Sequence, residues 1–180
     1  HYTTGFYVSD YYASYTSRTS HTGSSGRDQR WAGDTGYKSL SGTSMSSPSG
    51  AGAMTLVRQY LTDGWYPTGA PTPGHGFTPS AALIKAMTIS STDNDMIGQN
   101  IPSNVVGWGR MKIDNILYFP GDAARTALVD QTDGIATGEF LEYEIDVSDA
   151  SVPLKITLCW TDKEGVPASA RALVNDLDLT

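Results

Sequence analysis

The sequence has very little cysteine, little charge and no long hydrophobic run. Its 180 residues contain one cysteine, Cys159, which excludes an internal disulfide and any metal site built on paired cysteines. Charged residues make up only 17% of the chain and the net charge is −7. Because phosphate contacts need clustered lysine and arginine, we expect no nucleic-acid partner. No run approaches the ~18 apolar residues of a membrane span, so we expect no membrane partner either.

Because charged residues are few, we expect the surface to be polar but uncharged. The chain is rich in serine, threonine, tyrosine and glycine, with 19 glycines. This composition suits a loop-rich extracellular protein, so we expect a secreted one. The chain opens at His1 without a methionine or a basic and then apolar leader, which indicates an internal start. Cys159 lies in the apolar run Leu154–Trp160, which predicts a small buried thiol rather than a reactive one.

Two helices are predicted after a first stretch of about forty residues that is read as strand fragments joined by loops. Residues 44–62 have apolar positions on most faces, which is typical of a buried helix, and Asp63-Gly64 ends it. An exposed loop rich in proline and glycine follows over 65–77. Thr78 as N-cap and Pro79 in the first turn predict a second helix that continues to about residue 91. A last short helix is expected over 114–119.

The pattern changes beyond residue 120, where apolar and polar residues alternate. This period of two predicts antiparallel strands buried on one side, with Leu154, Ile156, Leu158 and Trp160 facing inward. The other alternating apolar positions are Leu141, Tyr143, Ile145, Val147, Leu173, Leu177 and Leu179. We therefore expect two units, 1–122 and 123–180. Three such strands with one apolar face rarely stand alone, so the second unit is expected to be incomplete.

The segment Gly42–Gly52 is the strongest candidate for chemistry. A serine hydroxyl is a poor nucleophile unless a base removes its proton, and the reaction also needs donors for the developing oxyanion. Ser44 stands at a predicted helix start, where unpaired N–H groups and the positive end of the helix dipole supply part of that need. Gly42 permits a sharp turn, and Pro48 fits a first helical turn, where its missing N–H costs little.

This segment resembles the catalytic-serine motif of the subtilases, Gly-Thr-Ser-Met-Ala-x-Pro-x-x-Ala-Gly. Ser46 replaces the common alanine, and Gly50 stands where the family usually has an apolar residue. The glycine is expected to weaken the helix by about 1 kcal/mol. The positions that match are Gly42, Thr43, Ser44, Met45, Pro48, Ala51 and Gly52.

Two further stretches agree with this resemblance. The helix begun by Thr78-Pro79 and the turn Gly107-Trp108-Gly109 look like elements that follow the serine in subtilases. The runs 154–162 and 172–179 resemble the jelly-roll domain of KP-43-type alkaline subtilases. The resemblance implies the α/β fold class: the C-terminal part of a three-layer domain with a mostly parallel sheet, followed by an incomplete antiparallel β-sandwich. It also implies an endopeptidase acting on protein or peptide substrates with Ser44 as nucleophile.

The residues that would activate Ser44 are not found. Subtilases carry their aspartate and histidine before the serine, and the 43 residues before Ser44 contain neither motif. His1, His21 and His75 are read as surface residues. Asn94, Asn100 and Asn104 follow the serine and cannot be the upstream oxyanion asparagine. The missing N-terminal part of the protease is therefore expected as a partner, and residues 1–180 alone are expected to be inactive and not to form a stable monomer.

Two questions stay open from the sequence. Substrate-binding residues are unknown, and an inactive subtilase fold that serves as an adhesion or binding module is the alternative function. The chemistry requires no cofactor or catalytic metal. A structural calcium site near Asn175, Asp176 and Asp178 is conceivable because calcium favours such oxygens, but solvated strand residues are the more economical reading.

Overall fold

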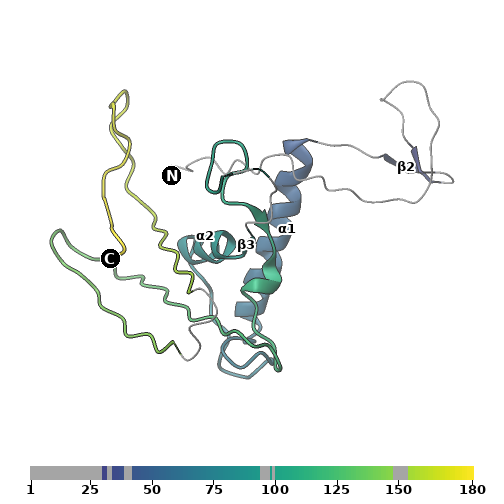
Figure 1. Cartoon of the computed structure of the whole chain (residues 1–180), viewed down its shortest axis with the longest axis horizontal. Coiled ribbons are helices and arrows are strands. Elements are labelled where there is room, and N and C mark those ends of the chain that lie inside the picture. Colours follow the sequence, from purple (N-terminus) through teal and green to yellow (C-terminus); the bar gives the residue numbers. More distant parts are fainter. Residues whose placement is uncertain (1–29, 32–33, 39–41, 94–97, 99, 148–153) are drawn as a thin grey trace.

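The computed structural model describes residues 30–31, 34–38, 42–93, 98, 100–147 and 154–180. Within these ranges lie two α-helices, two antiparallel pairs of short strands and one 3-10 turn. Helix α1 stands near the middle of Figure 1 with α2 beside it, and the described residues beyond 120 form long open loops. Among the described residues, no helix is both long enough and apolar enough to cross a membrane.

The first forty residues are represented by one strand pair. Strand β1 (Arg30–Trp31) pairs antiparallel with β2 (Asp34–Lys38) through an irregular register. This pair agrees with the expected strand fragments. His1 and His21 lie outside the described residues.

Helix α1 (Thr43–Thr62) confirms the helix predicted over 44–62. Its end is a Schellman motif, because the Gly64 nitrogen lies 3.2 Å from the Leu61 oxygen and the Trp65 nitrogen 3.0 Å from the Tyr60 oxygen. Gly64 has a φ of 76°, a left-handed conformation that a side chain would strain. The predicted stop at Asp63-Gly64 is therefore confirmed.

Helix α2 (Ala81–Ser90) starts later than predicted. Ser80, not Thr78, is the N-cap: its hydroxyl accepts a hydrogen bond from the Leu83 N–H at 3.0 Å. Pro79 consequently lies before the helix rather than in its first turn. Serine is the better N-cap of the two, and the Ser80 N–H is itself held by the carboxylate of Asp130 at 2.8 Å.

The segment after α2 forms a short hairpin and a single turn. Strand β3 (Thr92–Asp93) pairs antiparallel with β4 (Arg110–Met111), and the expected Gly107–Gly109 turn leads into β4. The helix predicted over 114–119 is wrong, since only the 3-10 turn η1 (Ile113–Asn115) forms. The backbone groups that would extend it are taken elsewhere: the Tyr118 carbonyl accepts from the Tyr60 hydroxyl at 2.6 Å, and the Phe119 N–H donates to Asp122 at 2.7 Å.

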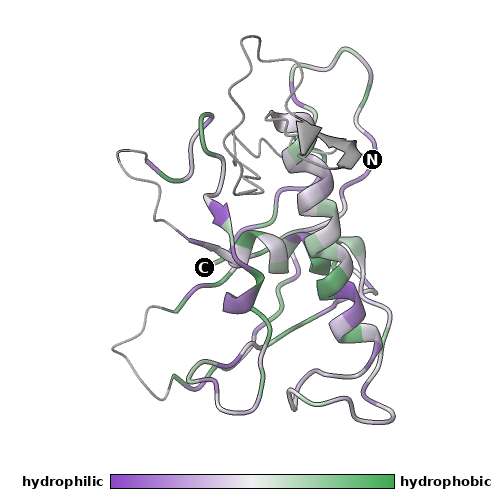
Figure 2. Ribbon diagram, turned by 90° about the vertical axis from the view of Figure 1, so that its right-hand side faces the viewer, coloured by the Kyte–Doolittle hydropathy of each residue, from purple (hydrophilic) through white to green (hydrophobic). Residues whose placement is uncertain are grey.

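The core lies between the second half of α1 and α2. In Figure 2 the hydrophobic residues of α1 gather in the part of the helix next to α2. Within the described chain α1 is not buried on most sides, because Leu56 is 53% exposed while Leu61 is fully buried. Burial on most sides stays a prediction, since it relies on the missing N-terminal part of the protease for the remaining cover. The described residues cover only one side of the helix. The buried core consists of Val57, Tyr60, Leu61, Leu83, Met87 and Ile116.

The described residues contain helices and antiparallel strand pairs but no parallel sheet. The two helices fit a helical layer of the expected α/β fold, and its mostly parallel sheet stays a prediction.

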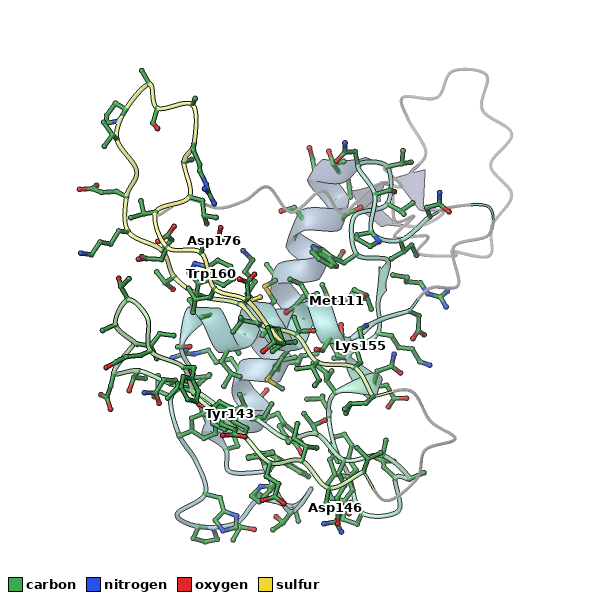
Figure 3. The ribbon with its side chains drawn as sticks, turned by 60° about the vertical axis from the view of Figure 1, so that its left-hand side comes forward. Met111, Tyr143, Asp146, Lys155, Trp160 and Asp176 are labelled. Atoms are coloured by element: carbon green, nitrogen blue, oxygen red, sulfur yellow. The ribbon has the colours of Figure 1, made fainter. Side chains whose placement is uncertain are left out.

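Residues 139–147 and 154–180 form no strand in the structure. Figure 3 shows Tyr143 and Asp146 on one open segment and Lys155 and Trp160 on another. The apolar side chains of the first segment are exposed by about half: Leu141, Tyr143, Ile145 and Val147. The β-sandwich is therefore not formed here, because an alternating strand is stable only when a neighbour pairs with it and a second layer covers its apolar face.

The predicted orientation of residues 154–160 is also wrong. Leu154 and Ile156 are 57% and 49% exposed, whereas Thr157 and Cys159 on the opposite side are partly buried. The side of Thr157 and Cys159 lies toward the end of α2, where the Ser90 hydroxyl binds Thr157. The Thr92 carbonyl at the start of β3 accepts from Lys155. Trp160 is partly buried rather than enclosed.

Candidate functional site

Ser44 is the second residue of α1 and is exposed to solvent. The chain turns into the helix at Gly42, whose φ of 143° lies in a region that side chains rarely adopt. The Gly42 carbonyl accepts from the N–H groups of Met45 at 3.0 Å and Ser46 at 3.2 Å. Ser44, the nucleophile predicted from the sequence, thus lies in the first turn of α1 after a glycine turn and is exposed to solvent.

The positive end of α1 is not neutralised by its own residues. Gly42 has no side chain with which to cap the helix, and the first turn contains no acidic residue. The first N–H groups of a helix have no intrahelical acceptor, which leaves the N–H of Ser44 suited to an incoming anion. A developing oxyanion beside Ser44 would meet this N–H and the favourable end of the dipole.

Pro48 lies in the second turn of α1, not in the first as predicted. A residue with an N–H at this place would donate to the carbonyl four residues earlier, which is that of Ser44. Proline has no N–H, so the Ser44 carbonyl lacks its usual helical donor. The small residue Ser46 is buried, at 3% exposure, and its hydroxyl bonds back to the Gly42 carbonyl at 3.3 Å.

The second turn of α1 approaches the side chain of Met111 in β4 at Gly50. A Cβ atom on Gly50 would meet the Met111 methyl carbon at 3.7 Å, an ordinary van der Waals contact. Figure 3 labels Met111 beside the helix. Sequence reasoning missed this contact, because nothing local links residues 50 and 111.

None of the described histidines stands near Ser44. His75 is exposed in the loop after α1, where its neighbour Gly76 packs against Thr62. Thr62 is the last residue of α1, so this loop lies about 27 Å from Ser44 along the helix axis. Asn100 and Asn104 are exposed, and Asn94 lies outside the described residues. The described chain therefore supplies the candidate nucleophile without a base.

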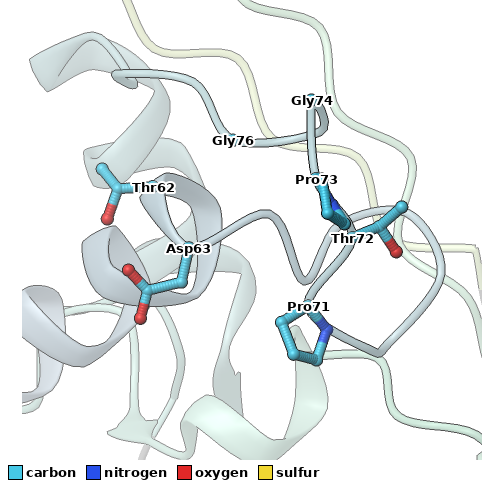
Figure 4. Close-up of a pocket in the computed structure, with 7 residues that line it drawn as sticks. All are labelled: Thr62, Asp63, Pro71, Thr72, Pro73, Gly74 and Gly76. Atoms are coloured by element: carbon cyan, nitrogen blue, oxygen red, sulfur yellow. The ribbon is translucent and has the colours of Figure 1, made fainter.

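A shallow hollow of about 370 Å³ opens at that same far end of α1 (Figure 4). Its one ionisable side chain is Asp63, whose carboxylate accepts a hydrogen bond from the Gln59 amide at 3.2 Å. Its distance from Ser44 and its single carboxylate give it no part in acyl transfer. The hollow is lined by Thr62, Asp63, Pro71, Thr72, Pro73, Gly74 and Gly76.

Two of the three candidate calcium ligands have protein partners. Asp176 forms an ion pair with Arg171 at 2.5 Å, and the Asn175 amide donates to Asp162 at 2.7 Å. The described residues contain no group of three histidine, cysteine or acidic side chains placed to hold a metal ion.

Asp162, which the sequence did not single out, links two segments of the C-terminal chain. Its carboxylate accepts from the Val174 N–H at 2.8 Å and the Asn175 N–H at 3.1 Å, and these bonds lower the pKa of Asp162. Burial raises the pKa of the partly buried Cys159 thiol, while nearby Lys85 opposes the shift. A thiol of this kind is protonated at neutral pH and a weak nucleophile, which agrees with its predicted structural role.

Comparison with known proteins places these features in a family. The model of the subtilase family matches residues 11–109, which include Ser44, α1 and α2. No solved structure matches the chain.

Three curated relatives, all from Dictyostelium discoideum, are similar to the chain. The serine protease/ABC transporter B family protein tagA is 33% identical over 78% of this chain and 8% of its own length. The proteins tagD and tagB of the same description are each 29% identical, over 79% and 80% of this chain and 10% of their own lengths. The chain thus spans a tenth or less of these relatives. Since the family model covers more than half of it, the chain belongs to the subtilase family.

Proposed function

We propose that the protein is a serine endopeptidase that cleaves protein or peptide substrates through an acyl-enzyme on Ser44. The observation that carries this proposal is the exposed position of Ser44 in the first turn of α1, inside the segment that resembles the subtilase serine motif. Family membership supports a serine protease in general terms. The names of the relatives, which include serine protease, support the same conclusion.

In the proposed mechanism, the Ser44 hydroxyl oxygen attacks the scissile carbonyl carbon. A histidine outside this chain removes the hydroxyl proton and later gives it to the leaving amine, and an aspartate orients that histidine. The Ser44 N–H donates to the oxyanion of the tetrahedral intermediate, helped by the uncompensated positive end of α1. Water then hydrolyses the acyl-enzyme by the same steps.

The remaining parts of the proposal concern the whole protein. We propose that it is secreted, on the basis of its polar and weakly charged composition. We also propose that residues 123–180 contribute to an antiparallel β-sandwich. The support is the alternation of apolar residues and the row of exposed apolar side chains that a second layer would cover. No cofactor is needed for the chemistry.

The direct test compares the peptidase activity of the full-length protein with that of two variants. Ser44→Ala removes the nucleophile and should abolish hydrolysis of a protein substrate. Ser47→Ala is the matched control, because Ser47 is an exposed serine one turn along the same helix. It should keep activity. Activity that survives in Ser44→Ala would disprove the assignment. A folded wild-type protein without activity would favour the binding module instead.

A further inference from the structure

Helix α2 is held at its N-terminal end by residues that follow the predicted boundary at 122. The Asp130 carboxylate accepts the N–H of the N-cap residue Ser80 at 2.8 Å. Two neighbouring contacts attach the same stretch: the Leu128 N–H donates to the Tyr66 hydroxyl at 3.2 Å, and the Thr126 hydroxyl donates to the Ile116 carbonyl at 2.9 Å. Residues 126–130 are therefore fixed to the helical part by three hydrogen bonds.

The C-terminal end of α2 is held by a second stretch. The Ser90 hydroxyl donates to the Thr157 hydroxyl at 2.6 Å, and the Lys155 amine donates to the carbonyl of Thr92, just beyond the helix, at 2.7 Å. Partial burial of this amine lowers the pKa of Lys155, although the residue as a whole is exposed. Figure 3 shows Lys155 on the segment that passes α2.

The charges at the two ends suit the helix dipole. An acid near the N-terminus and a base near the C-terminus both stabilise a helix. Helix α2 has no acid in its own first turn and no base in its last turn. Asp130 and Lys155 supply the two charges from sequence 40 residues and more beyond its end.

We propose that residues 126–130 and 154–157 form a two-point strap on α2, so that the chain after residue 122 belongs to the same folding unit as the helix pair that carries Ser44. Leu83 and Met87 of α2 are buried in the core with Val57 and Leu61 of α1. Loosening either end of α2 therefore loosens the surface on which α1 packs. The competing arrangement is an independent C-terminal module on a flexible linker.

Hydrogen exchange of the full-length protein, measured by mass spectrometry in a Ser44→Ala background, tests the strap independently of catalysis. Asp130→Ala should speed exchange at the start of α2 about tenfold, because the partly buried Ser80 N–H loses a charged acceptor. Asp130→Asn keeps an acceptor and should recover part of the protection. Thr157→Val should speed exchange around Ser90 and Thr92, and Thr157→Ser should restore it.

Matched controls separate this effect from general loss of stability. Asp133→Ala and Thr161→Val change exposed residues of the same types just beyond the two stretches and should leave α2 unchanged. Equal exchange at α2 in Asp130→Ala, Thr157→Val and the two controls would overturn the proposal. So would increases spread evenly over every segment of the protein.

Discussion

Replacement of Leu61 by alanine tests the packing of the helix that carries Ser44. Leu61 is fully buried in α1, in the cluster shared with Leu83 and Met87 of α2. The substitution removes three buried carbon atoms and leaves a cavity, so we expect the free energy of unfolding to fall by about 3–5 kcal/mol. Since total stabilities are about 5–15 kcal/mol, this loss should be readily seen in urea unfolding of the full-length protein.

Leu56→Ala is the comparison, because it makes the same change on the same helix at a residue that is 53% exposed. Because about half of the Leu56 side chain is already exposed to water, the substitution loses only about half of the transfer free energy and leaves no closed cavity. We therefore expect the free energy of unfolding to fall by about 1 kcal/mol. Equal losses for the two variants would refute the one-sided packing of α1. They would show instead that the helix is covered on most sides, as its sequence pattern predicts.

Three other changes have defined outcomes. Gly50→Ala should stabilise the protein by up to about 1 kcal/mol in thermal unfolding, because alanine favours the helix over glycine and the added methyl group meets only the end of the Met111 side chain. Destabilisation would mean that a neighbour lies closer to Gly50 than Met111 does. Tyr60→Phe removes the hydrogen bond to the Tyr118 carbonyl and should cost about 1 kcal/mol in urea unfolding, and no loss would mean that this bond is absent. Because the pKa of Asp162 is lowered, its hydrogen bonds stabilise the fold fully above the ordinary aspartate pKa of about 4 and are lost as the pH falls through the lowered value. The N–H groups that Asp162 binds should therefore lose exchange protection only in that acid range. A loss of protection near neutral pH would contradict this.

Features with local causes could be predicted from the sequence. The bounds of α1 follow from Gly42 at its start and from Asp63-Gly64 at its end, because capping depends on neighbouring residues. Ser44 was predicted as the nucleophile because the contiguous segment Gly42–Gly52 resembles the subtilase serine motif. The structure places Ser44 in the first turn of α1, exposed to solvent, and its role as nucleophile stays a prediction.

Features with distant causes could not. The start of α2 at Ser80 depends on Asp130, fifty residues later in the chain. The orientation of residues 154–160 was predicted from which side is apolar, but the adjoining helix end presents polar groups that bind Lys155 and Thr157. Periodicity identifies the two faces of a segment, whereas the partner decides which face is used.

The assignment of Ser44 as the nucleophile is tested most directly by labelling the full-length protein with a fluorophosphonate probe and locating the adduct by peptide mass spectrometry. Such a probe reacts with a serine only where a base activates it and donors stabilise the resulting oxyanion. We expect a single adduct on Ser44 and none in Ser44→Ala. An adduct on a different residue, or labelling that persists in Ser44→Ala, would contradict the assignment.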